Sequence, residues 1–119
     1  MSREPMGATD ENGQDVKKGG GVVLVGYRGT GKSTVGRILA ERTGRAFVEV
    51  DEEIVRRAGK TIRAIFEEDG EPAFRDIEEQ VVRDLSAGNP DGILGTGGGT
   101  ILREANRRAI RAHGLVAWL

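Results

Sequence analysis

The stretch GYRGTGKS at residues 26–33 constrains the fold more than any other part of this chain. It fits the pattern G-x-x-x-x-G-K-[ST], it follows the apolar run VVLV, and it precedes the helical pattern TVGRILAERTG. A strand, a glycine-rich loop and a helix in this order form a phosphate-binding loop, in which backbone N–H groups and the helix dipole hold an anion. The sequence therefore predicts a site for a nucleoside triphosphate.

Each residue type in this loop has an expected task. The glycines permit backbone conformations that point successive N–H groups at one phosphate. We expect Lys32 to reach the β- and γ-phosphates and Ser33 to bind Mg²⁺. A plain glycine-rich turn is the alternative, and the complete motif in its context disfavours it. The predicted ATP-phosphate site consists of Gly29, Thr30, Gly31, Lys32, Ser33 and Thr34.

Charge and composition narrow the class of partner. Lysine and arginine number 18 against 19 acidic residues, so no overall basic field attracts nucleic acid or an anionic membrane. The chain has no cysteine, which excludes disulfides. It also has no apolar run that suits a signal peptide or a membrane span. We expect a soluble cytoplasmic protein with small-molecule partners, no nucleic acid and no membrane.

The chain divides into a polar extension and one domain. Residues 1–21 are polar and glycine-rich, which predicts a disordered N-terminal extension. Residues 22–119 are predicted to fold together as an α/β domain, because β-rich runs alternate with helical patterns and imply a parallel sheet with right-handed crossovers. The predicted strands lie at 22–25, 46–50, 92–96 and 115–119.

Capping residues mark the helix ends. Gly44 is predicted to end the helix that follows the phosphate loop, and Asp51 to be the N-cap of the next helix. Thr61 is predicted to cap a short helix, and Pro72 suits the first turn of a longer one. The last helix, at about 103–112, carries an arginine-rich face that we interpret as solvated.

Two acidic residues lie at the C-terminal end of the second predicted strand, at the sheet edge that faces the phosphate loop. Asp51 is suited to orient or deprotonate an acceptor hydroxyl near the γ-phosphate, but a role as helix N-cap explains it equally well. Glu49 is expected on the same side by strand alternation. It either contacts Mg²⁺ through water or is an exposed strand residue.

Arg75 and a run of glycines are the remaining candidates. Arg75 lies in the first turn of a helix, where the dipole disfavours a cation, and its guanidinium suits a substrate carboxylate. Without further information, a surface ion pair with Glu71 or Glu78 is the preferred interpretation. The glycines at 97–99 follow the third strand and are expected to let a ligand approach the backbone closely, a flexible turn being the weaker alternative.

Four segments together resemble the shikimate kinases over essentially all of residues 22–119. They are GYRGTGKSTVGRILA, FVEVDEEI, IFEEDGEPAFRDIE and GTGGGTI. The resemblance implies a three-layer α/β/α P-loop kinase fold with a parallel sheet, of which four strands are present and a fifth is missing. It also implies transfer of the γ-phosphate of ATP to the 3-hydroxyl of shikimate, a step of chorismate and aromatic amino acid biosynthesis.

The resemblance also assigns roles to residues. It makes Lys32 and Asp51 catalytic, and Ser33 a ligand of Mg²⁺. Glu49 stands where the family usually has aspartate and would contact Mg²⁺ through water with altered reach. The implied partners are ATP and shikimate, and full-length relatives are expected to be monomers. The implied shikimate-binding residues are Asp51, Arg75, Gly97, Gly98 and Gly99.

The family continues beyond the position of residue 119 with a lid, further arginines, a fifth strand and an adenine-binding loop. We therefore expect weak or no turnover from this chain alone. An unpaired apolar strand edge also predicts self-association or marginal stability. Two other functions remain open: a nucleotide-binding module without catalysis, and a kinase for another polyol of the gluconate kinase type. The sequence GEPAFR and the triple glycine argue against the last.

Overall fold

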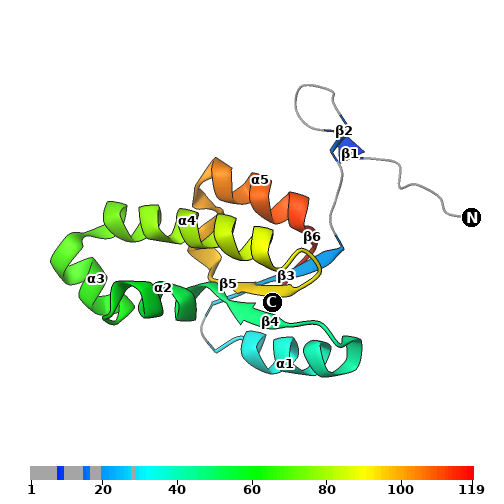
Figure 1. Ribbon diagram of the computed structural model, residues 1–119. Coiled ribbons are helices and arrows are strands. Elements are labelled where there is room, and N and C mark those ends of the chain that lie inside the picture. The colour runs from blue at the N-terminus through cyan, green and yellow to red at the C-terminus, as the bar shows by residue number, and fades with distance from the viewer. Residues whose placement is uncertain (1–7, 10–14, 17–19, 28) are drawn as a thin grey trace, which may run out of the picture.

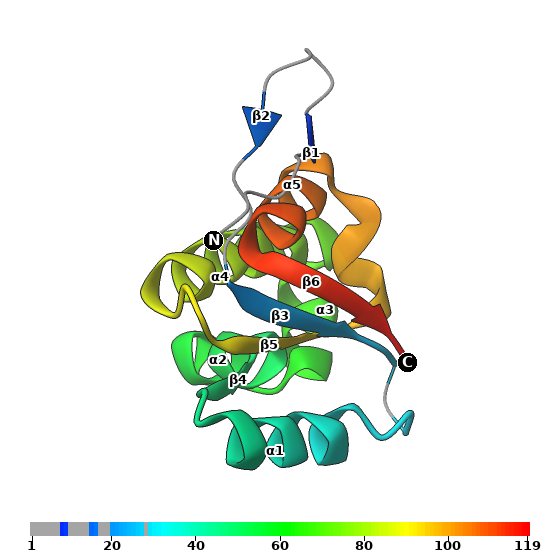
Figure 2. The ribbon, with the colours of Figure 1, turned by 90° about the vertical axis from the view of Figure 1, so that its right-hand side faces the viewer.

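The computed structural model describes residues 8–9, 15–16, 20–27 and 29–119. Its centre is a four-stranded parallel sheet with the order β4-β5-β3-β6 (Figure 2). The strands are β3 (Gly21–Val25), β4 (Phe47–Glu49), β5 (Ile93–Thr96) and β6 (Gly114–Trp118). Two short strands, β1 (Ala8–Thr9) and β2 (Asp15–Val16), pair antiparallel with each other. The sheet confirms the predicted α/β class.

Helices cover both faces of the sheet, with α1 on one side and α4 and α5 on the other (Figure 1). The helices are α1 (Lys32–Thr43), α2 (Val50–Ala58), α3 (Ile62–Asp69), α4 (Glu71–Gly88) and α5 (Glu104–His113). A 3₁₀ helix, η1 (Gly98–Leu102), connects β5 to α5. The layers form the predicted three-layer arrangement.

The core has two parts. One lies between α2, α3 and α4 and consists of Val50, Ile54, Ile65, Phe74, Val81 and Val82. The other joins the sheet to α5 and consists of Val23, Val25, Leu94 and Ile110. Strands β3 and β5 are almost continuously apolar because parallel strands covered on both faces have no solvent side.

Gly36 allows α1 to pack closely on the sheet. It is the buried residue of that helix, and a Cβ atom built on it would lie 2.3 Å from Cζ of Phe47 on β4. Any larger residue would push the helix away from the strand. The contact sets how closely α1 lies against β4 and so helps to place the phosphate loop that precedes this helix.

Helix ends confirm most of the capping predictions. Gly44 ends α1 with a left-handed backbone (φ 72°), and the hydroxyl of Thr61 accepts a hydrogen bond from the N–H of Ala64 at 3.1 Å. Pro72 lies in the first turn of α4. The last helix runs over Glu104–His113 instead of 103–112.

The prediction that Asp51 is an N-cap is wrong. The strand predicted over 46–50 ends at Glu49, and α2 begins at Val50, so Asp51 lies in the first turn. Val50 and Ile54 are both fully buried, four residues apart on one helical face, and this packing sets the helix start. Strand alternation consequently does not relate Glu49 to Asp51.

Strand β6 lies at one edge of the sheet and pairs in parallel with β3 (Figure 2). No other described strand pairs with its second edge. Leu115 and Trp118 on this strand are 65% and 61% exposed. The apolar edge expected from the sequence is therefore present, and self-association stays a prediction.

Most of the predicted disordered extension lies outside the described residues, so that prediction is untested. Within 1–21 only 8–9, 15–16 and 20–21 are described. Among the described helices, none combines the length and the apolarity needed to cross a membrane.

Candidate functional site

A single cleft brings the predicted nucleotide and acceptor residues together. It measures about 520 Å³ and lies where β3, β4 and β5 end, the edge at which open parallel sheets bind ligands. The phosphate loop, the start of α2, helices α3 and α4, and the glycines after β5 all contribute to its lining. Every predicted site residue lines this cleft except Thr30.

The phosphate loop has the backbone that an anion site requires. Gly29 and Gly31 adopt positive φ angles of 87° and 86°, which side chains with a Cβ rarely adopt. Thr30, the residue outside the cleft, donates its hydroxyl to the carbonyl of Tyr27 at 2.8 Å and thereby braces the loop. Helix α1 begins directly afterwards with no side-chain cap and no acidic residue in its first turn. Its N-terminal N–H groups and positive dipole end therefore remain available to an anion.

Lys32, Ser33 and Glu49 form a polar group beneath the loop. Nζ of Lys32 donates to the carbonyl oxygen of Thr96 at 3.2 Å and lies 3.8 Å from Oε1 of Glu49. Oγ of Ser33 donates to Oε2 of Glu49 at 3.1 Å. Glu49 is therefore not the exposed strand residue of the alternative interpretation, since it faces both polar residues of the phosphate loop.

Asp51 lines the cleft from the first turn of α2. Its carboxylate makes no side-chain hydrogen bond or ion pair with any described residue. Glu53, two residues along, is instead held by Arg56 and Arg57 at 2.6 and 2.8 Å. Among the described residues, Asp51 and its neighbour Glu52, which also lines the cleft, are thus the acidic side chains of this turn that remain available to a ligand.

Arg75 both forms ion pairs and lines the cleft. Its Nη1 lies 2.9 Å from Oε1 of Glu78, its Nε lies 3.4 Å from Glu71, and Cζ lies 5.1 Å from the ring centroid of Phe74. Burial alone would lower the pKa of Arg75, but hydrogen bonding and charge from Glu78, and then from Glu71, outweigh it and raise this pKa. The ion pairs favoured from the sequence are confirmed, and Arg75 faces the cleft as well.

The glycines after β5 make room for neighbours. A Cβ on Gly98 would lie 2.4 Å from Cζ of Tyr27, and a Cβ on Gly99 would lie 2.8 Å from Nη2 of Arg75. Gly97 has open space around the corresponding position. The run is therefore not a free turn, because two of its members touch the phosphate loop and the arginine.

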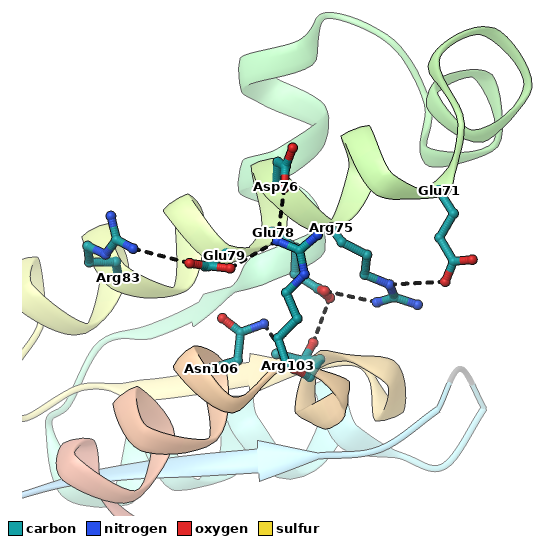
Figure 3. A network of polar contacts seen from close by, with 9 residues as sticks. Glu71, Arg75, Asp76, Glu78, Glu79, Arg83, Arg103 and Asn106 are labelled. Carbon is teal, nitrogen blue, oxygen red and sulfur yellow. Dashed lines mark hydrogen bonds and ion pairs between the residues drawn. The ribbon is translucent and has the colours of Figure 1, made fainter.

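A network of polar contacts ties α4 to the segment after β5 (Figure 3). Nη1 of Arg103 lies 2.9 Å from both Asp76 and Glu79, which connects the start of α5 to α4. Glu78, which is buried, accepts from Arg75 with one oxygen and from the hydroxyl of Thr100 at 2.7 Å with the other. The sequence indicated Glu78 only as an ion-pair partner, and gave no signal for Thr100.

The residues present suit a magnesium ion bound together with phosphates. Mg²⁺ prefers hard oxygen ligands and commonly uses one or two protein groups plus phosphates and waters. Ser33 and Glu49 supply a hydroxyl and a carboxylate within 3.1 Å of each other beside the loop. In the described residues there is no cluster of three or more acidic or histidine side chains that would hold a metal alone.

A parallel sheet with a phosphate loop after its first central strand, facing acceptor-side residues across one cleft, defines the P-loop kinase class. The family model described as shikimate kinase matches residues 28–119 of this chain. The chain belongs to the shikimate kinase family.

Individual relatives agree with this assignment. A shikimate kinase from Chromobacterium violaceum is 48% identical over 103 residues, which is 87% of this chain and 55% of the relative. The shikimate kinase from Acinetobacter baumannii in complex with shikimate superposes with a TM-score of 0.78 at 44% identity, covering 83% of this chain and 55% of that one. A gluconokinase from Sinorhizobium meliloti, at 23% identity and a TM-score of 0.50 over 86% of this chain and 57% of that one, shares the fold alone. The chain spans about half the length of the curated relatives it matches.

Proposed function

We propose that this chain carries the Mg-ATP and shikimate sites of a shikimate kinase in one cleft, where the γ-phosphoryl group is transferred to the 3-hydroxyl of shikimate in a cytoplasmic step of chorismate biosynthesis; we expect turnover by this chain alone to be weak or absent. The observation that carries the proposal is the single cleft shared by the phosphate loop, Asp51 and Arg75. Family membership supports the reaction class, and the relative solved in complex with shikimate supports the acceptor.

On the nucleotide side, the loop N–H groups and the N-terminus of α1 hold the phosphates. The position of Lys32 beside Thr96 and Glu49 supports a role in reaching the β- and γ-phosphates and neutralising charge that develops during transfer. Ser33 and Glu49 would hold Mg²⁺, Ser33 directly and Glu49 through water. Bound there, the metal would offset the negative charge of the phosphates.

On the shikimate side of the cleft, Asp51 and Arg75 have different roles. Asp51 has no competing partner among the described residues, which suits a group that orients the 3-hydroxyl and accepts its proton. The hydroxyl oxygen forms a bond to the γ-phosphorus while the bond from that phosphorus to the bridging oxygen breaks, and ADP leaves. Arg75 and the glycine backbone at 97–99 would hold the carboxylate of shikimate.

Paired binding and turnover measurements on the chain test this proposal. We expect Lys32→Ala to weaken Mg-ATP binding by roughly tenfold or more with shikimate binding almost unchanged, and Asp51→Asn to show the opposite pattern. Glu41→Gln, on the exposed face of α1, is the control and should alter neither. ADP release that requires both shikimate and Lys32 would support transfer by this chain.

Other outcomes assign other functions. Nucleotide binding that depends on Lys32, without any binding of shikimate, would support a nucleotide-binding module instead. ADP release with gluconate and not with shikimate would support a kinase for another polyol. Mg-ATP binding that is indifferent to Lys32→Ala would contradict the nucleotide site itself.

A further inference from the structure

Thr100 has a buried hydroxyl that contacts the carboxylate of Glu78, the residue with which Arg75 is paired. The residue lies in η1, directly after the glycine run, and is 0% exposed. Its Oγ1 donates to Oε2 of Glu78 at 2.7 Å, and Glu78 itself is only 2% exposed. Oε1 of the same carboxylate accepts from Nη1 of Arg75 at 2.9 Å. The two oxygens of Glu78 are therefore occupied by two different donors.

The backbone of Thr100 is fixed as firmly as its side chain. Its N–H donates to the carbonyl of Gly97 at 3.2 Å, and its own carbonyl accepts from Nδ2 of Asn106 at 2.9 Å. Asn106 is 1% exposed and lies on α5, where it is part of the network in Figure 3. One residue thus sets both the position of the glycine run and the orientation of the Glu78 carboxylate.

This arrangement determines which edge of the Arg75 guanidinium is available. Nε and Nη1 donate to Glu71 and Glu78, whereas Nη2 makes no hydrogen bond with any described residue. A Cβ on Gly99 would lie 2.8 Å from Nη2, 3.0 Å from Nη1 and 3.2 Å from Cζ, so the glycine run packs against the guanidinium on this side. Nη2 is therefore the guanidinium nitrogen left to bind a ligand.

We propose that Thr100 is a positioning residue for binding of the shikimate carboxylate. By occupying Oε2 of Glu78, Thr100 limits the contact between Glu78 and Arg75 to a single hydrogen bond and keeps Nη2 of Arg75 on the side of the glycine run. This inference rests on the proposed function of Arg75. Thr100 lies behind the cleft and acts through Glu78.

Loss of the hydroxyl has a definite physical consequence. Oε2 would remain buried without a donor, which is costly for a charged group. The nearest relief is rotation of the carboxylate so that both oxygens meet the guanidinium, because two-armed pairing is the favoured geometry between arginine and carboxylate. Such pairing would turn Nη2 away from Gly99 and weaken the hold on the acceptor.

Two variants separate the hydroxyl from the shape of the side chain. Thr100→Val keeps the shape without the hydroxyl, and Thr100→Ser keeps the hydroxyl. Calorimetric titration of the chain with shikimate and, separately, with Mg-ADP should show Thr100→Val weakening shikimate binding about five- to fiftyfold. Binding of Mg-ADP should change by less than about twofold, and Thr100→Ser should stay close to the wild type for both ligands.

Several results would overturn the proposal. Unchanged shikimate binding in Thr100→Val would do so, as would equal weakening of both ligands or equal loss in Thr100→Ser, since these indicate general disruption. Crystal structures of unliganded wild type and Thr100→Val provide a test that needs no shikimate: two-armed pairing of Glu78 with Arg75 is expected in the variant, and one-armed pairing in both would reject the idea. Failure of the wild type to bind shikimate would instead contradict the proposed function.

Discussion

Oγ of Ser33 and Oε2 of Glu49 lie 3.1 Å apart, so the first polar residue after the loop lysine is hydrogen-bonded to the carboxylate at the end of β4. The other oxygen of Glu49 faces the ammonium group of Lys32 at 3.8 Å. If Glu49 contributes to magnesium binding through water, its charge favours nucleotide binding only when the metal is present. This gives a test that does not depend on catalysis.

Glu49→Gln should reduce the enhancement of nucleotide binding by Mg²⁺ by roughly tenfold, the size of one interaction with a charged group. The affinity for ATP in the presence of a chelator should not fall, because the glutamate charge repels free phosphates. Titrations of ATP with Mg²⁺ and with EDTA provide the measurement. Glu49→Asp, which retains the charge, is the matched control; equal magnesium enhancement in wild type and Glu49→Gln would exclude this role.

The contact between Gly36 and Phe47 leads to a prediction about stability. Gly36→Ala places a Cβ atom 2.3 Å from Cζ of Phe47, so α1 or the ring must move, and we expect a loss of about 1–3 kcal/mol in the free energy of unfolding. Gly88→Ala is the matched control, because Gly88 is also helical and a Cβ there would meet nothing within 4 Å. That variant should be neutral or slightly stabilising.

Urea denaturation of the two alanine variants measures this difference. In the double variant Gly36→Ala with Phe47→Leu, a smaller side chain replaces the ring. This variant should recover part of the free energy of unfolding that Gly36→Ala loses, because the two sites are in contact. Equal stability of Gly36→Ala and Gly88→Ala would mean that α1 can shift without cost.

Local signals in the sequence were sufficient for much of this fold. The phosphate loop, the stop at Gly44 and the cap at Thr61 depend on backbone conformations and hydrogen bonds within a few residues, and each is present as predicted. The start of α2 depends instead on the burial of Val50 against distant helices. The run FVEV alternates like a strand, and only tertiary contact shows that its last residue is helical.

On the shikimate side of the cleft, the difference between local signals and long-range contacts is larger. Arg75 was identified from the sequence, where an ion pair and a ligand-binding role were treated as alternatives. In the structure Arg75 both forms the ion pair and lines the cleft, so the two interpretations do not exclude each other. The hydroxyl of Thr100 lies 22 residues from Glu78 in the sequence, and a threonine after glycines carries no local signal for a buried bond to a carboxylate. Such partners cannot be inferred from the sequence, because they come together only when α4 packs on η1.

Glu53 makes stability depend on pH. Hydrogen bonds from Arg56, and then from Arg57, lower the pKa of Glu53 from 4.5 to about 2. Because the folded pKa is below the unfolded one, the stabilisation is fully present above pH 4.5 and is lost as the pH falls toward 2. Urea unfolding across this range should show a shallower loss of stability in Glu53→Gln than in the wild type. Glu52→Gln, whose carboxylate has no partner among the described residues, should retain the wild-type slope.

The exposed edge of β6 yields the last prediction. Leu115 is 65% exposed on a strand whose second edge has no partner among the described strands, so we propose that copies of this chain associate through that edge at high concentration. Leu115→Lys should shift sedimentation velocity profiles toward the monomer, because a charged residue on an edge strand opposes pairing. Leu102→Lys is a matched control, since Leu102 is 66% exposed but lies on η1, outside the sheet. A wild-type chain that sediments as a monomer at all concentrations, or equal effects of the two lysine variants, would contradict association through β6.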